Sequence, residues 1–229
     1  MSSFRFDHYS KSNSIGPHHN ENQDSFLVDE QNLLFAVADG VGGYLGAKQA
    51  SSIAVETLSE HASDIIDEAS LEEVIEKIHE RILAKAETLH FPNMGTTLAV
   101  LKLLPDLGKL IVGNVGDSPI LMVRNNSMES IYEDDSHRSR DPKSMYEIVQ
   151  YLGLGQKLDI HMRSIQLTTG DTILLCSDGI TDNLLNSVGR ETELASMVML
   201  NNARMVVEAA IERGVKADDM TAVIVALGF

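Results

Sequence analysis

Two blocks near the start of the chain carry apolar side chains at helical spacing. In the first block they recur every three to four positions: Ala50, Ala54, Leu58, Ala62 and Ile65. This spacing predicts a helix of about five turns with one apolar face. The second block predicts a helix over 70–88, in which Ser70 is the N-cap and Glu73, three residues later, completes a capping box.

Strand-like apolar runs account for most of the remaining pattern. They cover residues 24–29, 33–38, 96–104, 109–115, 119–124, 160–167, 172–176 and 221–227. Further helices are predicted around 191–199 and 203–213, and a polar loop over 132–143. Because strands come in adjacent groups and helices in blocks, the pattern predicts an α+β fold with antiparallel sheets rather than a parallel doubly wound sheet. No linker or repeat divides the chain, so we expect one domain over residues 1–229.

Composition narrows the classes of function. With 18 Lys and Arg against 34 Asp and Glu, the formal net charge is −16, which disfavours binding to nucleic acid and to anionic membranes. No apolar run reaches the roughly 20 residues needed to span a bilayer, and the N-terminal residues lack a signal-peptide pattern. The single cysteine, Cys176, cannot form an internal disulfide, so we expect a cytoplasmic protein.

Acidic residues recur at the ends of the predicted strands. Three pairs and one single residue have this placement: Asp39-Gly40, Asp178-Gly179, Asp218-Asp219 and Asp24. An Asp-Gly pair is a common turn signal, so each pair alone is more readily explained as a turn. Several together, at the mouths of buried strands, indicate a site for a hard divalent cation such as Mg²⁺ or Mn²⁺, which prefers oxygen ligands.

Six short motifs in order carry a resemblance to a known family. They are Asn22-Gln23-Asp24, Val37-Ala38-Asp39-Gly40-Val41-Gly42-Gly43, Gly95-Thr96-Thr97, Val115-Gly116-Asp117-Ser118, Cys176-Ser177-Asp178-Gly179 and Asp218-Asp219-Met220-Thr221. Together they resemble the metal-dependent Ser/Thr protein phosphatases of the protein phosphatase 2C family, bacterial type, over nearly the whole chain. The resemblance implies two antiparallel sheets packed as a sandwich and flanked by pairs of helices, a four-layer αββα arrangement.

The resemblance also implies a cleft with two Mn²⁺ or Mg²⁺ ions at one edge of the sandwich. Asp39 would bridge both metals, Asp178 and Asp218 would complete the first site, and the carbonyl of Gly40 would serve the second. Asp24 would hold a water on the metal. Hydrolysis by a metal-activated water needs no protein nucleophile, and we expect Cys176 to be a buried strand residue.

The sequence departs from the family pattern at the phosphate-binding position. The family usually has Arg three residues before the Asn of its first motif, whereas here that residue is His19. One interpretation is that His19 binds the substrate phosphate more weakly, with a single hydrogen bond. The equally supported alternative is that His18 and His19 are ordinary loop residues. Pro119 replaces another usual Arg, after the Gly-Asp-Ser motif, and lacking a backbone donor it should lie at a strand start or edge.

A short flap over about 133–159 takes the place of a longer segment in many bacterial relatives. An Asp in this region supports a third metal in the family. Asp134 and Asp135 both precede Ser136-His137; we favour Asp135, with a solvated acidic loop as the equal alternative.

These observations predict a cytoplasmic bacterial phosphatase acting on phosphoserine and phosphothreonine in proteins. Its partners would be a phosphoprotein substrate and a Ser/Thr kinase that it opposes, with no nucleic acid or membrane. One alternative is a dedicated phosphatase for an anti-sigma-factor antagonist in a partner-switching pathway, indicated by Asp219 where many relatives have Asn. The other is a pseudophosphatase that binds a phosphoprotein without turning it over, indicated by the missing Arg.

Overall fold

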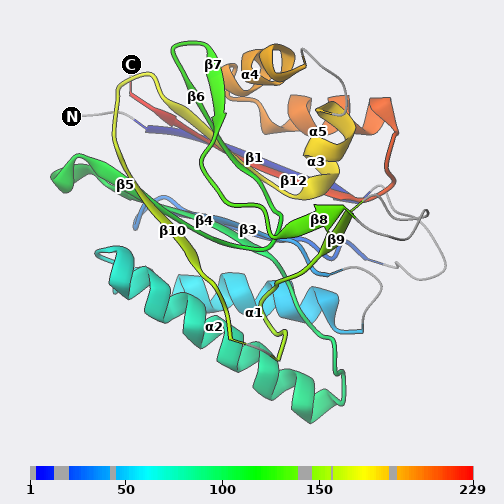
Figure 1. Cartoon of the computed structure of the whole chain (residues 1–229). Coiled ribbons are helices and arrows are strands. Elements are labelled where there is room, and N and C mark those ends of the chain that lie inside the picture. The colour runs from blue at the N-terminus through cyan, green and yellow to red at the C-terminus, as the bar shows by residue number, and fades with distance from the viewer. Residues whose placement is uncertain are drawn as a thin grey trace.

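Two five-stranded antiparallel sheets pack face to face in the computed structural model of the chain (Figure 1). The structure describes residues 4–12, 21–41, 45–138, 146–155, 157–185 and 190–228. In spatial order, the first sheet contains β1 (Phe4–Ser12), β12 (Asp219–Leu227), β11 (Thr172–Cys176), β6 (Ile120–Arg124) and β7 (Ser127–Ser130). The second contains β10 (His161–Gln166), β5 (Lys109–Val115), β4 (Leu98–Leu104), β3 (Leu34–Ala38) and β2 (Ser25–Asp29). A separate two-stranded ladder joins β8 (Ser136–Arg138) to β9 (Tyr146–Ile148).

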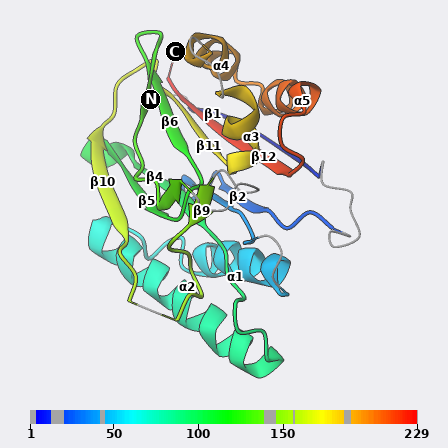
Figure 2. The same ribbon diagram turned by 45° about the vertical axis from the view of Figure 1, so that its right-hand side comes forward.

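Helices cover the outer face of each sheet. The second sheet is covered by α1 (Ala47–Glu60) and α2 (Glu68–Leu89), and the first by α3 (Asp178–Leu184), α4 (Glu191–Met199) and α5 (Ala203–Arg213) (Figures 1 and 2). The predicted α+β fold with four αββα layers is therefore confirmed. Within the described ranges, no helix is both long enough and apolar enough to cross a bilayer.

Three apolar layers hold the fold together, and strand alternation assigns side chains to them. In β3, Phe35 and Val37 belong to the layer between the sheets, whereas Leu34, Ala36 and Ala38 pack toward α1 and α2. All five are fully buried, as expected for a strand covered on both faces. β12 behaves in the same way, because Val223 and Val225 face the other sheet while Ala222 and Ile224 pack toward α3–α5.

Two predictions about the helices need correction. α1 ends at Glu60, about a turn before the predicted end, although Ala62 and Ile65 remain buried in the same apolar layer. α2 starts earlier than predicted, because Asp67 is its N-cap. The capping box joins Asp67 and Ser70, since the Asp67 carboxylate accepts from the Ser70 N–H and the Ser70 hydroxyl binds the Asp67 backbone N–H. Ser70 is thus the third helical residue.

The structure also contains strands in segments that were not predicted as strands. β1, β7, β8 and β9 are short of buried apolar positions, and β8 lies within the predicted loop 132–143. β1 gains its place through long-range pairing, with nine consecutive partners along β12 from Phe4–Leu227 to Ser12–Asp219. Pro119 directly precedes β6, and Cys176 is the buried last residue of β11, so both predictions are confirmed.

Candidate active site

Strand alternation brings polar side chains of both sheets to one end of the layer between them. Asp39 continues the face of Phe35 and Val37, two residues beyond the latter. From the first sheet, Ser177 follows Ile173 and Leu175, and Thr221 precedes Val223, in the same alternation. The apolar layer therefore gives way at this end to carboxylates and hydroxyls that face one another across the sandwich.

The backbone around Asp39 is fixed by two threonines of the Gly95-Thr96-Thr97 motif. The Asp39 N–H donates to Thr97 Oγ1 at 3.0 Å, and its carbonyl accepts from Thr96 Oγ1 and from the Thr97 N–H, each at 2.8 Å. Thr97 Oγ1 also lies 2.6 Å from Ser118 Oγ. These hydrogen bonds hold the residue after β3 against the start of β4, so the Asp39 side chain projects from a rigid position.

Two glycines allow backbone segments to approach closely beside the acidic residues. A Cβ on Gly40 would lie 2.7 Å from the carbonyl carbon and oxygen of Ala47 and 2.8 Å from the carbonyl oxygen of Gln23. A Cβ on Gly179 would overlap the carbonyl oxygen of Asp219 and approach the Cβ of Asp218 to 3.1 Å. Only glycine fits both positions without moving the backbone, and at Gly179 this brings the start of α3 against the start of β12.

Asp24 is a buried carboxylate that joins the two sheets. Its Oδ2 accepts hydrogen bonds from Ser177 Oγ at 2.9 Å and from Thr221 Oγ1 at 2.7 Å. Its Oδ1 is also buried but has no hydrogen-bond partner among the residues that the structure describes. An unpartnered buried oxygen is rare in proteins and points to a ligand or water that completes its hydrogen bonding.

Burial and mutual repulsion raise the pKa values of the clustered carboxyls. The pKa of Asp39 lies well above its ordinary value, mainly because the side chain is buried and then because Asp24 and Asp178 repel its negative form. Burial is also the main reason why the pKa values of Asp24 and Asp117 rise to about 7. A cation among these carboxyls would offset their charge and let them ionise together at lower pH.

Lys216 supplies a positive charge within this cluster. Its Nζ lies 2.5 Å from Asp178 Oδ2, 2.9 Å from Asp218 Oδ2 and 3.0 Å from Asp182 Oδ2. Burial disfavours the charged ammonium, but the three carboxylates outweigh that effect and raise its pKa. Neither Lys216 nor Asp182 was among the site residues predicted from the sequence. A signal was present for Asp182, which lies one helical turn after Asp178, whereas Lys216 belongs to no motif although it stands two residues before Asp218.

The donor set fits a divalent cation of the Mg²⁺ or Mn²⁺ type. As the side chains stand, no three Asp, Glu, His or Cys residues in the described part of the chain are grouped closely enough to hold a metal ion. Three aspartates instead surround the ammonium of Lys216, which serves as a stand-in cation. All nearby acidic donors are hard oxygens, and the unpartnered Oδ1 of Asp24 lies among them, so their chemistry matches these ions rather than zinc.

The other predicted site residues have different surroundings. Asp135 Oδ2 accepts from the Gly116 N–H at 2.8 Å and from Gln150 Nε2 at 2.9 Å, while its Oδ1 lies 2.8 Å from His161 Nε2. Asp135 thus supports the loop that carries Asp117, which is itself close enough to Asp39 to raise the pKa of that carboxyl. The role of Asp135 toward a third metal stays a prediction. His19, with His18, lies outside the described residues.

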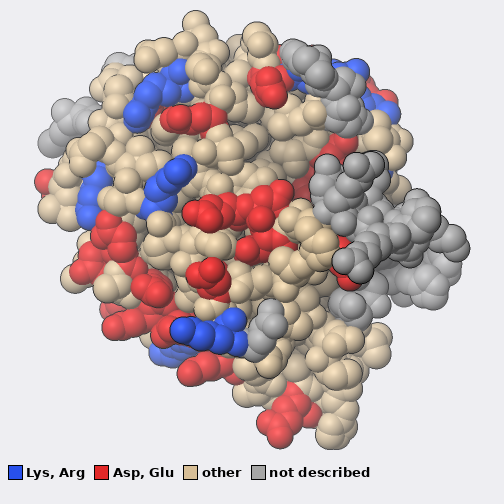
Figure 3. Space-filling model, in the orientation of Figure 1, with Lys and Arg blue, Asp and Glu red and all other residues tan. Residues whose placement is uncertain are grey.

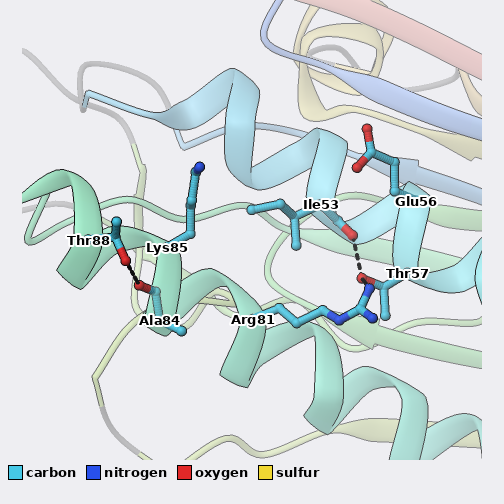
Figure 4. Close-up of a pocket in the computed structure, with 7 residues that line it drawn as sticks. All are labelled: Ile53, Glu56, Thr57, Arg81, Ala84, Lys85 and Thr88. Atoms are coloured by element: carbon cyan, nitrogen blue, oxygen red, sulfur yellow. Dashed lines mark hydrogen bonds between the residues drawn. The ribbon is translucent and has the colours of Figure 1, made fainter.

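A surface groove lies away from the acidic cluster. It has a volume of about 330 Å³ and runs between α1 and α2, where Arg81, Lys85 and Glu56 are among its lining residues (Figure 4). Arg81 is already paired with Glu60 at 2.6 Å and donates to Thr57 Oγ1. None of the clustered aspartates lines the groove. By contrast, Figure 3 shows Asp and Glu side chains gathered across the middle and left of the face seen in Figure 1, a field that attracts cations.

Comparison with known proteins finds similarity to protein phosphatases, both in a family sequence model and in individual relatives. The sequence model of the protein phosphatase 2C family matches residues 17–213, a match that ends before Asp218. A serine/threonine phosphatase stp of Listeria innocua is 29% identical over 187 residues, covering 72% of this chain and 73% of the relative. Protein phosphatase PhpP of Streptococcus pneumoniae is 24% identical and covers 93% of this chain and 94% of its own length.

Solved structures of similar fold extend over the whole chain. The PPM Ser-Thr phosphatase MsPP of Mycobacterium smegmatis, in complex with cacodylate, superimposes with a TM-score of 0.73 at 27% identity and covers 98% of both chains. The catalytic domain of the serine threonine protein phosphatase PstP, in complex with two manganese ions, gives a TM-score of 0.83 at 21% identity over 100% of both chains. The match to the family model spans well over half of the sequence, and the chain belongs to the protein phosphatase 2C family.

Proposed function

We propose that this chain is a metal-dependent phosphatase that hydrolyses phosphoserine and phosphothreonine in proteins with Mn²⁺ or Mg²⁺. The observation that carries the proposal is the cluster of aspartates assembled from the ends of both sheets, in which the pKa values of Asp39 and Asp178 are raised and Lys216 is the counter-cation. Membership of the protein phosphatase 2C family supports the same activity. Relatives named as Ser/Thr phosphatases and a structural neighbour with two manganese ions agree with it.

Each residue of the cluster has a role in this proposal. Asp39, Asp178 and Asp218, with the carbonyl of Gly40, would hold two divalent cations. Such cations lower the pKa of a water molecule and offset negative charge on the phosphoryl oxygens. Asp24, fixed by Ser177 and Thr221 through one oxygen, keeps its second oxygen free to accept a proton or a hydrogen bond from a water.

A cysteine-based mechanism is not supported. Cys176 lies at the end of β11 with no exposed surface, and burial raises the pKa of its thiol. The reactive form of cysteine is the thiolate, which this environment disfavours. Water is therefore the nucleophile that the residues favour.

This activity indicates the class of substrate and the kind of partner, but no individual protein. A phosphoprotein is the substrate class, and a Ser/Thr kinase whose products are dephosphorylated is the partner that we infer. His19 would contact the phosphate, and Asp135 would serve a third metal; both assignments stay predictions, as does a cytoplasmic location. Neither a dedicated anti-sigma-factor-antagonist phosphatase nor a pseudophosphatase is favoured by the relatives, which are named as Ser/Thr phosphatases.

The proposal is tested by hydrolysis of p-nitrophenyl phosphate and a phosphothreonine peptide with Mn²⁺, with Mg²⁺ and with chelator. We expect turnover that requires metal and falls by at least ~100-fold in Asp39→Asn and in Asp178→Asn. Replacing a residue that only hydrogen-bonds to a metal ligand already lowers metal affinity or activity by about 10–100-fold, so the loss of a ligand itself should lower activity further. Asp106→Asn, which changes an exposed carboxyl, is the matched control and should keep full activity. Turnover that persists in chelator, or in both site variants, would contradict the proposal.

A further inference from the structure

Lys216 is held at the centre of the acidic cluster through both its side-chain ammonium and its backbone. Its ammonium contacts Asp178, Asp218 and Asp182 at 2.5–3.0 Å. Its backbone is fixed separately by the buried side chain of Asn183. Asn183 Oδ1 accepts from the Lys216 N–H at 2.8 Å, and Asn183 Nδ2 donates to the Lys216 carbonyl at 3.0 Å.

Because different groups hold the backbone and the ammonium of Lys216, the loop can stay in place when the ammonium moves. Asn183 Nδ2 also donates to the carbonyl of Gly179 at 2.7 Å, so the loop before β12 is tied to α3 without any help from the lysine side chain. About a third of the Lys216 side chain is exposed, at 38%. The ammonium can therefore leave the carboxylates for solvent by side-chain rotation alone, while Asp178 and Asp218 keep their places.

We propose that Lys216 is a tethered internal cation that occupies the first metal position in the metal-free protein and must be displaced when a divalent cation binds. The proposal rests on the proposed function, because Asp178 and Asp218 are the residues assigned to that metal. Lys216 thereby sets the metal concentration at which the enzyme switches on. It also limits repulsion among the carboxylates while the metal is absent.

The physical basis is competition between two cations for one set of oxygens. A divalent ion bound by Asp178 and Asp218 must first break the ion pairs of Lys216, and this lowers its apparent affinity. Because the ammonium is partly solvated, each pair contributes modestly. We therefore expect the three together to weaken Mn²⁺ binding by about tenfold.

Isothermal titration of chelator-stripped protein with Mn²⁺ tests this proposal. Lys216→Met keeps the length of the side chain but removes its charge, and it should bind Mn²⁺ about tenfold more tightly than the wild type. In chelator its melting temperature should fall, because three carboxylates lose their counter-cation. Lys216→Arg keeps the charge and should stay close to the wild type in both measurements. Lys109→Met is the matched control, because Lys109 pairs with Glu68 away from the cluster.

The outcomes separate this proposal from the proposed function. Equal or weaker Mn²⁺ binding by Lys216→Met, in a protein that still melts cooperatively, would overturn the role of Lys216 while leaving the metal site intact. If neither the wild type nor Lys216→Met binds Mn²⁺, both proposals fail. A second readout is the ¹⁵N-labelled side-chain ammonium signal of Lys216 during titration with diamagnetic Mg²⁺. The proposal requires this signal to shift as Mg²⁺ binds, and an unchanged signal at saturation would contradict displacement.

Discussion

Asp24 illustrates how the surroundings of one residue set the proton balance of the site. Burial raises its pKa from 3.8 to about 7, although the hydroxyls of Thr221 and Ser177 act in the opposite direction. The folded state therefore holds a proton on Asp24 at pH values where the unfolded chain has lost it. Its stabilising contribution is fully present below the unfolded pKa near 4 and is lost as the pH rises through about 7.

This sign predicts the pH dependence of stability in the metal-free protein. Between pH 5 and pH 7, Asp24 should lower the free energy of unfolding by up to roughly 1.4 kcal/mol for each pH unit. Asp24→Asn, which cannot ionise, should flatten that slope. Urea unfolding in chelator at pH 5, 6, 7 and 8 measures it, with the exposed Asp106→Asn as the control. An identical pH slope in the wild type and Asp24→Asn would show that Asp24 is not protonated in the folded protein.

At the scale of single residues, the aspartates of the cluster could be predicted from the sequence, but the positive charge that offsets their negative charges could not. Asp39, Asp178 and Asp218 could be chosen because each stands beside a strand end in a recognisable motif. Lys216 belongs to no such motif. Its ammonium reaches the cluster because Asn183 fixes the loop, and that contact joins α3 to the chain 33 residues later. Local patterns carry no information about such a pairing.

Among the elements, the junction between α3 and β12 depends most on one small residue. Gly179→Ala would push a methyl group into the carbonyl of Asp219 and against Asp218. We expect the backbone to shift, at a cost of about 1–3 kcal/mol, and Mn²⁺ affinity to fall by about tenfold or more, because Asp178 and Asp218 move apart. Melting curves and metal titration measure the two effects.

Gly155→Ala is the matched control for this prediction. A Cβ on Gly155 meets nothing within 4 Å, so the substitution should leave both stability and metal affinity close to those of the wild type. If Gly179→Ala also bound Mn²⁺ with unchanged affinity, close approach at this junction would not be what positions the two aspartates.

Elements with strong apolar patterns were predictable, and those held by distant partners were not. The bounds of β5, β11, α4 and α5 match the predicted ranges, because each contributes regular buried positions. The apolar pattern predicted too long a helix for α1, because Ala62 and Ile65 lie in the core beyond the end of the helix. β1 escaped prediction because its side chains are only partly buried. Its strand conformation comes from pairing with β12, more than 200 residues away.

Across the whole molecule, the site is shared between the two sheets. Asp24 and Asp39 flank strands of the second sheet, while Asp178 and Asp218 flank strands of the first. A divalent cation bound among them would tie the sheets together at one end of the sandwich. Ligand that binds only the folded state stabilises it by ~2.7 kcal/mol at a concentration 100 times its dissociation constant. For a chain of this size, that corresponds to a rise of about 5–10 °C in melting temperature.

Asp39→Asn should separate the stability of the fold from the function of the site. In the described part of the chain Asp39 has no ion-pair partner, and burial with repulsion from neighbouring aspartates raises its pKa. Replacing it with a neutral amide removes that repulsion, so the metal-free variant should melt at a higher temperature than the metal-free wild type at pH 7.5. It should also gain no stability from Mn²⁺, because it lacks a carboxylate that we propose as a metal ligand.

Asp178→Asn is the informative comparison, since Asp178 is paired with Lys216. Its loss removes an attraction as well as a repulsion, so the metal-free variant should gain less stability than Asp39→Asn, while the Mn²⁺ response disappears in both. Differential scanning calorimetry with Mn²⁺ and with chelator measures the metal-free melting temperature and the Mn²⁺-induced rise for both variants. A metal-free Asp39→Asn that melts no higher than the wild type would mean that its buried charge is already neutralised. A full Mn²⁺ response in that variant would remove Asp39 from the metal site, and with it the link between the two sheets.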